Sequence, residues 1–232
     1  MKEIDAVILC GGLGSRLKKV VHDRPKPMAE IQGRPFLDIL IDHTAAFGIT
    51  RYILCTGYMA NCIEHYYAQT TGPLTFSFSK EKIPLGTGGA LKNAESLIRS
   101  NPVLVLNGDS FCPVDLDGFI THHRAKNAQI SLVVSETKDS IDFGSLWMDK
   151  KGRIVGFQEK MNHTQDLINA GVYLFDKKVL AMIPPYKQYS LEHDLFPEFV
   201  GKKFYGFLSA EKVLDIGTPE RYELAKKLLV RK

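Results

Sequence analysis

The sequence predicts one α/β domain built on a mixed β-sheet. Over about residues 1–110, short apolar runs alternate with helical patterns, which is typical of a parallel sheet with helices on both faces. After Asp109 the runs follow one another through tight turns, which indicates antiparallel strands. A glycine-rich segment directly follows the first run, and ligands of open α/β sheets bind at the carboxyl ends of the strands. We therefore expect a ligand site that begins where the first strand ends.

Each element of the first half has its own signal. Residues 4–10 form a short apolar run, which predicts a buried strand. Residues 35–48 have proline at the start and glycine at the end, the pattern of a helix. Residues 74–81 alternate with period two, the pattern of a half-buried strand. In full, we expect strands at 4–10, 51–57, 74–81 and 102–109, and helices at 35–48, 61–69 and 89–98.

The second half is expected to complete the domain. Strands are predicted at 128–137, within 144–160 and at 167–175, with a hairpin turn at 149–152, and helices at 190–200 and 218–230. Thr218 is the expected N-cap of the last helix, because Pro219 follows it and Glu220 stands in the first turn. No internal repeat or linker marks a boundary, so the sequence predicts a single domain.

Composition narrows the class of function. The 232 residues are 44% hydrophobic and 24% charged, the balance of a globular protein with a substantial core. The net charge of +4 comes without a block of lysine and arginine, which argues against nucleic-acid binding and suits an anionic small molecule. The first apolar run is too short for a signal peptide, and no stretch has the length of a membrane helix. We expect a cytoplasmic protein with no nucleic-acid or membrane partner.

The four cysteines, Cys10, Cys55, Cys62 and Cys112, are scattered without CxxC spacing. This pattern favours reduced, partly buried thiols over disulfides. It also argues against a cysteine-bound metal.

The stretch LCGGLGSRL, from Leu9 to Leu17, has the composition of a phosphate cradle. It fails the dinucleotide fingerprint, because a pattern that starts at Gly12 requires glycine where Leu17 stands, and it also fails the P-loop pattern. Glycines nevertheless expose backbone N–H groups, and Arg16 can bind an anion through two donors. The alternative is a tight strand-to-helix turn with a solvated arginine.

A second basic residue follows in RPKPMAEIQGRPFL, residues 24–37. Lys26 stands between Pro25 and Pro27, and prolines hold the backbone extended and rigid. We therefore expect a stiff, extended loop that places the charge of Lys26. The alternative is an exposed lysine in a proline-rich loop.

Together these two stretches resemble the signature of the sugar-1-phosphate nucleotidyltransferases, the NDP-sugar pyrophosphorylases. The resemblance continues in order through LGTGGAL (85–91), LNGD (106–109), FQEK (157–160), NAGVY (169–173), SLEHD (190–194) and DIGTPERY (215–222). It implies a single-domain, Rossmann-like, three-layer α/β/α nucleotidyltransferase (GT-A-like) fold with a mixed central sheet. The domain would cover 1–232, with a nucleotide-binding half at about 1–110 and a sugar-binding half at about 111–232.

The resemblance implies that a sugar 1-phosphate attacks the α-phosphorus of a nucleoside triphosphate and displaces pyrophosphate. The attacking phosphate oxygen is anionic near neutral pH, so the reaction needs positioning and cations rather than a catalytic base. By resemblance, Arg16 and Lys26 bind the triphosphate and Lys160 binds the sugar phosphate. The implied cofactor is Mg²⁺, held by Asp109 and Asp215, since Mg²⁺ prefers one or two protein carboxylates.

The same resemblance assigns the other site residues. Those expected to bind the nucleotide are Leu9, Gly11, Gly12, Gly14, Ser15, Arg16, Glu81, Gly86, Thr87 and Gly108. Those expected to bind the sugar are Asn107, Gly144, Glu159, Lys160, Asn169, Ala170 and Gly171. Small residues suit such places because the backbone must reach the ligand. Glu192 and Asp194 stay open between a ligand contact and a local helix cap.

Glu81 bears on the choice of base. A carboxylate only accepts hydrogen bonds, and guanine offers two donors, N1–H and N2–H, on one edge. Uracil and thymine offer one donor, N3–H, beside carbonyls that repel a carboxylate. The residue favours GTP, although some uridylyltransferases of the family carry glutamate here, so UTP and CTP remain alternatives.

Within the family, the chain looks most like the D-glycero-α-D-manno-heptose 1-phosphate guanylyltransferases of bacterial surface-polysaccharide synthesis, which includes capsule and S-layer glycans. The alternatives are a mannose-1-phosphate guanylyltransferase, a uridylyl- or cytidylyltransferase, and an inactive homologue that senses nucleotide sugars. The retained basic and acidic site residues favour an enzyme. The family's proline and threonine after Arg16 are missing from RLKKVVHD (16–23), which leaves the closing of that loop open. The resemblance is also compatible with a homo-oligomer.

Overall fold

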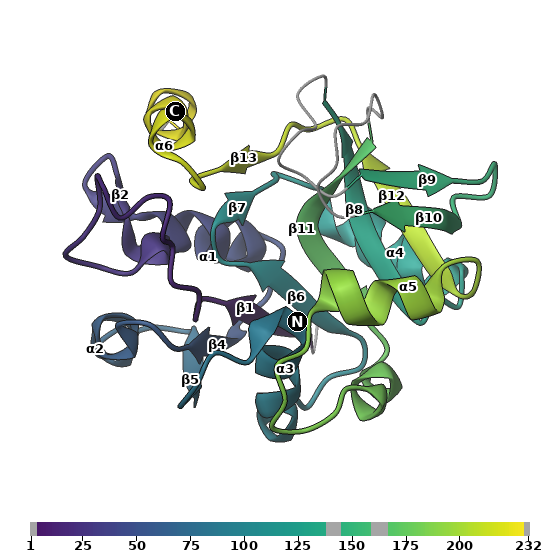
Figure 1. The fold of residues 1–232 in the computed structure, drawn as a ribbon, viewed down its shortest axis with the longest axis horizontal. Coiled ribbons are helices and arrows are strands. Elements are labelled where there is room, and N and C mark those ends of the chain that lie inside the picture. Colours follow the sequence, from purple (N-terminus) through teal and green to yellow (C-terminus); the bar gives the residue numbers. More distant parts are fainter. Residues whose placement is uncertain (1–3, 138–144, 159–166, 230–232) are drawn as a thin grey trace.

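The computed structural model describes residues 4–137, 145–158 and 167–229, and most of their strands join one large mixed sheet (Figure 1). The strands are β1 (Asp5–Leu9), β2 (Glu30–Ile31), β3 (Arg34–Pro35), β4 (Arg51–Thr56), β5 (Thr75–Lys80), β6 (Val103–Asn107), β7 (Ser110–Phe111), β8 (Ile130–Glu136), β9 (Ser145–Met148), β10 (Ile154–Gln158), β11 (Leu167–Phe175), β12 (Phe204–Ser209) and β13 (Leu214–Asp215). The α-helices are α1 (Phe36–Ala46), α2 (Ala60–Ala68), α3 (Gly86–Asn93), α4 (Leu116–Ala125), α5 (Phe196–Phe199) and α6 (Pro219–Leu228). Four short helical segments complete the description: the 3₁₀ helices η1 (Lys26–Met28), η2 (Glu95–Leu97) and η3 (Lys177–Met182), and the π-helix η4 (Leu191–Leu195).

The sheet combines a parallel and an antiparallel part, as the sequence predicted. Its strand order is β10-β9-β11-β6-β1-β4-β5, and β8 and β12 join beside β11. The strands β6, β1, β4 and β5 are parallel, whereas β11 runs antiparallel to β6. The first half of the chain thus supplies the parallel part, and the second half extends it.

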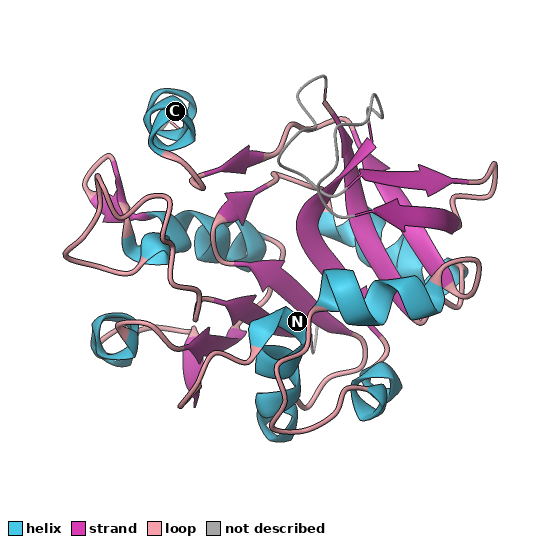
Figure 2. Ribbon diagram, viewed as in Figure 1, coloured by secondary structure: helices cyan, strands magenta, loops and turns pink. Residues whose placement is uncertain are grey.

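The strand β1 is buried on both faces, which explains its continuous apolar sequence. Ala6 and Ile8 belong to the hydrophobic core on one face, together with the buried side of α1. Val7 belongs to the core on the other face, together with Ala90 and Leu91 of α3. Helices therefore cover both faces of the sheet (Figure 2), and the three-layer arrangement is confirmed.

Several elements differ from the sequence prediction. The helix α4 begins after Asp115, whose side chain accepts a hydrogen bond from the N–H of Asp117, and the strand β12 pairs parallel with β8. The predicted helix at 89–98 begins earlier, at Gly86, and its last turn is the separate η2. The predicted helix at 190–200 is η4 followed by α5. These differences depend on tertiary contacts, which override local preferences over short segments.

The C-terminal part of the chain returns to the first half. The strand β13 pairs with β7, and α6 lies beside the segment that contains β2, at the top of Figure 1. The predicted cap of α6 is confirmed, because the side chain of Thr218 accepts a hydrogen bond from the N–H of Arg221. The two halves of the sequence are therefore interleaved in space.

The four cysteines are free thiols, and Cys10, Cys55 and Cys112 are buried. Burial raises the pKa of each of these three thiols. Among the described residues, no helix combines the length and the apolar character needed to span a bilayer.

Asp5 provides a test of the fold. Its side chain is 2% exposed, accepts hydrogen bonds from the N–H groups of Arg99 and Ser100, and lies 2.9 Å from Arg51. Asp5→Ala leaves these donors without a partner, and we expect the free energy of unfolding to fall by about 2–3 kcal/mol in urea titrations. Asp42→Ala is the control, because its exposed pair with Arg34 should contribute at most about 1 kcal/mol. Equal losses in the two variants would contradict this assignment.

Candidate active site

One cavity of about 480 Å³ lies at the carboxyl ends of β1 and β6, where the sequence predicted a ligand site. The expected site residues in its wall are Leu9, Gly11, Gly12, Gly14, Ser15, Arg16, Lys26, Glu81, Gly86, Thr87, Asn107 and Asp109. Gly108 lies behind this wall, and its N–H donates to the carbonyl of Leu9 at 3.0 Å. Segments far apart in the sequence thus converge on one cavity, while their roles in binding stay predictions.

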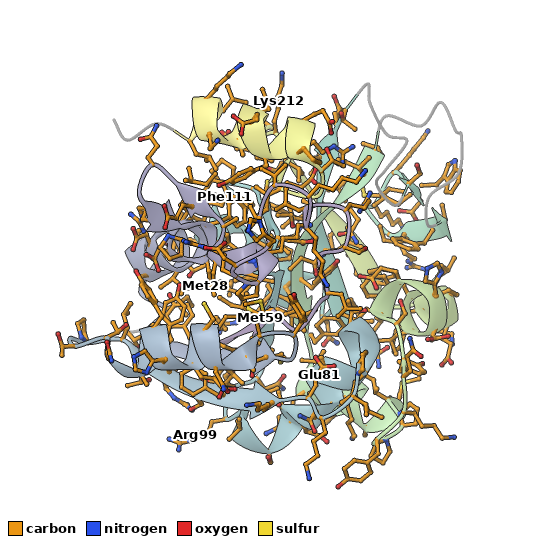
Figure 3. All side chains as sticks on the ribbon, turned by 60° about the vertical axis from the view of Figure 1, so that its left-hand side comes forward. Met28, Met59, Glu81, Arg99, Phe111 and Lys212 are labelled. Atoms are coloured by element: carbon orange, nitrogen blue, oxygen red, sulfur yellow. The ribbon has the colours of Figure 1, made fainter. Side chains whose placement is uncertain are left out.

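Gly11 allows a carboxylate to lie against the glycine-rich loop. A Cβ atom on Gly11 would collide with Oε1 of Glu81, which follows β5 (Figure 3). The other carboxylate oxygen, Oε2, accepts a hydrogen bond from the N–H of Leu85 at 2.7 Å. Burial raises the pKa of Glu81, and the Leu85 hydrogen bond opposes part of this shift. The carboxylate is therefore held in the cavity wall, and its partial burial there makes the side chain a weaker acid.

Lys26 does not lie in the extended loop that its flanking prolines predicted. Pro25 is extended, but Lys26 begins the 3₁₀ helix η1. Two hydrogen bonds close this turn, from Met28 N–H to the Pro25 carbonyl at 2.8 Å and from Ala29 N–H to the Lys26 carbonyl at 3.0 Å. These bonds outweigh the preference of a residue before proline for extended backbone.

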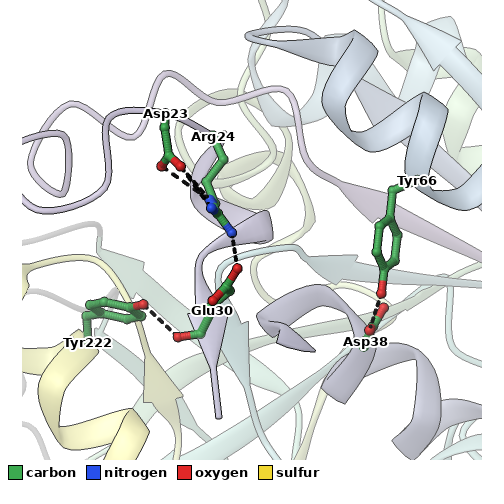
Figure 4. Close-up of polar contacts among 6 residues, drawn as sticks. All are labelled: Asp23, Arg24, Glu30, Asp38, Tyr66 and Tyr222. Atoms are coloured by element: carbon green, nitrogen blue, oxygen red, sulfur yellow. Dashed lines mark hydrogen bonds and ion pairs between the residues drawn. The ribbon is translucent and has the colours of Figure 1, made fainter. Parts of the chain in front are cut away.

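The segment that carries Lys26 is anchored at both ends (Figure 4). Arg24 pairs with Asp23 at 2.8 Å and also with Glu30. The hydroxyl of Tyr222, in α6, donates to the backbone carbonyl of Glu30 at 2.6 Å. The C-terminal helix therefore helps to position a residue of the first half.

Strand pairing brings the two expected metal ligands together. Asp109 directly precedes β7 and Asp215 belongs to β13, in which it lies opposite Ser110. The N–H of Ile216 donates to the backbone carbonyl of Asp109 at 3.0 Å. Of these two carboxylates from distant motifs, Asp109 lines the cavity, whereas Asp215 lies behind Gly217, which lines it.

Each of these carboxylates has a cation beside it. Lys26 Nζ lies 2.6 Å from Asp109 Oδ2, and Arg221 Nη1 lies 3.0 Å from Asp215 Oδ2. The side chain of Asp109 is 44% exposed and that of Asp215 only 13%, so Asp109 is the more accessible. A Cβ on Gly217 would lie 3.6 Å from Lys26 Nζ and 3.7 Å from an Arg16 nitrogen, so both cations border this glycine.

A segment of the second half, residues 187–192, completes the cavity wall. Tyr189 N–H donates to the Leu85 carbonyl at 2.8 Å, and the Tyr189 carbonyl accepts from Gly88 and Gly89 at 2.9 and 3.0 Å. Gly86 has a φ of +72°, and a Cβ there would lie 2.8 Å from the Tyr189 carbonyl oxygen. The glycines of LGTGGAL therefore let segment 187–192 pack against the start of α3.

Gln188 and Gly217 line the cavity although sequence reasoning did not select them. Gln188 is exposed, and its side chain has no hydrogen bond within the described part of the chain. Gln188 lies just before the SLEHD motif, and this position is the sequence signal that could have identified it as a site residue. Gly217 falls inside DIGTPERY, the motif in which the resemblance points to Asp215.

The expected sugar-binding residues divide into two groups. Asn107 lines the cavity, and its Nδ2 and that of Asn169 donate to the hydroxyl of Tyr173 at 3.4 and 2.9 Å. Gly171 packs against Asn107, whereas the side chain of Ala170 is buried in the hydrophobic core. Gly144, Glu159 and Lys160 lie outside the described residues, and their roles stay predictions.

Comparison with known proteins identifies the family. The model of the nucleotidyl transferase family matches residues 5–231. The crystal structure of HddC from Yersinia pseudotuberculosis, complexed with GMP-PN, superposes with a TM-score of 0.84. Its sequence is 36% identical over 97% of this chain and 98% of that one. The chain belongs to the nucleotidyl transferase family, which confirms the resemblance drawn from its motifs.

Two sequence relatives have more specific names. A D-glycero-α-D-manno-heptose 1-phosphate guanylyltransferase from Aneurinibacillus thermoaerophilus is 37% identical, over 97% of this chain and 98% of that protein. A mannose-1-phosphate guanylyltransferase from Mycobacterium tuberculosis is 35% identical, over 99% of this chain and 65% of that protein. The first relative therefore matches this chain over nearly the full length of both.

Two glycine substitutions distinguish a glycine required by the packing of the fold, Gly86, from a glycine that faces open space in the cavity, Gly12. Gly86→Ala forces a left-handed backbone on alanine and a clash with Tyr189, so we expect the free energy of unfolding to fall by about 2 kcal/mol or more. A Cβ on Gly12 would meet no atom within 4 Å, so the free energy of unfolding of Gly12→Ala should stay within about 1 kcal/mol of the wild-type value. Chemical denaturation measures both, and a comparable loss in Gly12→Ala would contradict the contrast.

Proposed function

We propose that the protein transfers GMP from GTP to a sugar 1-phosphate, D-glycero-α-D-manno-heptose 1-phosphate, and releases pyrophosphate. The observation that carries the proposal is one cavity lined by a glycine-rich loop, the cations Arg16 and Lys26 and the carboxylate of Asp109, with Asp215 beside its wall. The product would be GDP-heptose, a donor for surface-polysaccharide synthesis. The reaction needs no general base, because the attacking phosphate oxygen is already anionic.

Arg16 and Lys26 are proposed to bind the triphosphate. Both border Gly217 at one edge of the cavity, and the glycine-rich loop approaches the same space with its backbone. Cations placed where charge develops stabilise a phosphoryl-transfer transition state. Lys160, which lies outside the described residues, is proposed from the family resemblance to bind the sugar phosphate.

The carboxylates fit a magnesium ion. Asp109 and Asp215 are neighbours through the β7–β13 pairing, and the described residues hold no cluster of three or more His, Cys, Asp or Glu suited to a metal. Two carboxylates are the usual protein share for Mg²⁺, because phosphates and water complete its octahedron. Bound there, Mg²⁺ would neutralise charge on the phosphates. Asp109, the more accessible carboxylate, would exchange Lys26 for the metal.

Guanine is the proposed base. Glu81 accepts one hydrogen bond from Leu85, and each carboxylate oxygen has two lone pairs, so capacity remains for N1–H and N2–H of guanine. The solved structure of HddC is a complex with GMP-PN, which supports a guanine nucleotide. Heptose is preferred over mannose because the heptose 1-phosphate guanylyltransferase relative matches over nearly its full length.

A pyrophosphate-release assay tests the proposal. Purified protein with Mg²⁺ is assayed with GTP, UTP, CTP, ATP and dTTP, each combined with heptose, mannose and glucose 1-phosphate. We expect the highest kcat/KM with GTP and D-glycero-α-D-manno-heptose 1-phosphate. A higher kcat/KM with mannose 1-phosphate would mean that mannose, not heptose, is the preferred sugar. A higher kcat/KM with UTP would mean that uracil, not guanine, is the preferred base.

The control for this assay is Asp109→Ala. Loss of a metal ligand should lower Mg²⁺-dependent turnover at least about 100-fold, which corresponds to about 2.7 kcal/mol of transition-state stabilisation. Circular dichroism must show that the variant is folded. Near wild-type turnover in a folded variant would contradict the metal assignment.

The raised pKa of Glu81 predicts how base selectivity depends on pH. A raised pKa means that Glu81 takes up a proton at a higher pH than an ordinary glutamate, and the protonated group loses an acceptor. The affinity for GMP relative to UMP should therefore fall as the pH is lowered, and the fall should begin at a pH at which an ordinary glutamate is still ionised. Calorimetry measures both ligands, and their shared phosphate cancels from the ratio.

Glu81→Gln is the matched variant for this measurement. The side-chain amide of glutamine does not titrate, and only its oxygen accepts hydrogen bonds. The ratio of the affinities for GMP and UMP should therefore fall about tenfold and no longer depend on pH. Retention of the wild-type ratio would mean that the base is recognised elsewhere.

A further inference from the structure

The two acidic residues of SLEHD, Glu192 and Asp194, have different surroundings. Asp194 is exposed, and its Oδ2 accepts a hydrogen bond from the N–H of Ser190 at 2.7 Å, within the same short helix. Glu192 is half-buried and turns toward the start of α3 and toward β11. The sequence left both residues open between a ligand contact and a local cap, and the structure separates them.

The carboxylate of Glu192 links Thr87, which lines the cavity, to Ser190 and to Tyr173 of β11. Its Oε2 accepts hydrogen bonds from the hydroxyls of Thr87 at 2.7 Å and Ser190 at 2.9 Å. Its Oε1 lies 3.5 Å from the hydroxyl of Tyr173, a side chain with no solvent exposure. Thr87 also accepts from the N–H of Leu191 at 2.8 Å, so its hydroxyl is engaged within the protein.

The hydrogen bonds beyond Tyr173 have a defined direction. A carboxylate accepts only, so in its 3.5 Å contact with Glu192 the Tyr173 hydroxyl is the donor, and toward the two asparagine amides it is the acceptor. Both asparagine amides therefore turn Nδ2 toward Tyr173, at 2.9 Å for Asn169 and 3.4 Å for Asn107. The amide oxygen of Asn169 then accepts from Gly171 N–H at 3.0 Å. The contact with Glu192 thus favours the orientation in which each asparagine turns Nδ2 to Tyr173, and for Asn169 the Gly171 N–H favours the same orientation.

One acceptor at the end of this chain of hydrogen bonds has no partner in the described part of the protein. Oδ1 of Asn107 is buried and has no hydrogen bond within the described residues, although Asn107 lines the cavity. A buried polar atom without a partner is costly, so a ligand donor that reached it would restore a lost hydrogen bond. Sugar hydroxyls are donors of this kind.

We infer that Glu192 is a positioning residue for sugar recognition, acting through Tyr173 on the amide of Asn107. The inference rests on the proposed function and adds to it a specific route by which a sugar hydroxyl is recognised. Asp194, which caps its own helix, has no such role.

The test compares substrate constants for Glu192→Ala, Glu192→Gln, Tyr173→Phe and Asp194→Asn. With D-glycero-α-D-manno-heptose 1-phosphate and GTP, we expect Glu192→Ala to raise the KM for the sugar phosphate about 10-fold to 100-fold. The KM for GTP should change less than about threefold. The isosteric Glu192→Gln should show a smaller increase, because an amide still accepts but no longer sets the direction of the hydrogen bonds. Asp194→Asn should keep both KM values.

Tyr173→Phe and the double variant test the route. Tyr173→Phe should raise the KM for the sugar phosphate as Glu192→Ala does, and combining the two changes should add little, because both break one chain of hydrogen bonds. Full additivity, equal increases for GTP and sugar phosphate, or a matching effect of Asp194→Asn would overturn the inference. If the wild type releases no pyrophosphate with any sugar 1-phosphate, the proposed function fails and the inference with it. If the wild type is active and the variants keep its constants, the inference alone fails.

Discussion

The pairing of two very short strands, β7 and β13, is the constraint on which the site depends. It places Asp215 opposite Ser110 and directs the chain into α6. From α6, Tyr222 holds the carbonyl of Glu30 and Arg221 pairs with Asp215. The segment before Glu30 carries Lys26. The pairing of β7 with β13 therefore positions the carboxylate of Asp215 and the cation of Arg221, and through Tyr222 it also anchors the segment of Lys26. Local sequence preferences could not achieve this, since two-residue strands have little stability of their own.

Charge balance explains why these groups can share one edge of the cavity. Two carboxylates close together would repel each other, and burial would increase the repulsion. Lys26 lies against Asp109 and Arg221 against Asp215, so each negative charge is compensated. The same cations suit a polyanionic ligand, which would take over the pairing with Lys26 while a divalent cation took over Asp109. Under the proposed function, the ion pair between Lys26 and Asp109 would therefore be exchanged for contacts with the ligand and the metal.

The reliability of sequence reasoning differed with the range of the interactions involved. The bounds of β1 and α1 were predicted to within one or two residues. A continuous apolar run, and a helical pattern with proline at its start and glycine after its end, are signals that the local sequence carries. The turn at Lys26 was predicted wrongly, because its hydrogen bonds outweigh the proline rule. Gln188 was missed, since its place in the cavity depends on contacts between Tyr189 and the glycines of α3. The separation of Glu192 from Asp194 likewise required knowledge of which neighbours surround η4.

By itself the sequence determined the family, the alternation of strands and helices, and the residue types expected around a nucleotide and a metal. Motifs carry this information because each glycine, lysine or aspartate keeps its chemistry wherever the chain places it. The tertiary structure decided which of these residues share a cavity, which carboxylate is accessible and which acidic residue of SLEHD faces the site. These outcomes depend on hydrogen bonds and ion pairs between residues up to about 190 positions apart, such as Tyr222 and Glu30. Contacts at that separation are set by how the sheet closes, which no local pattern records.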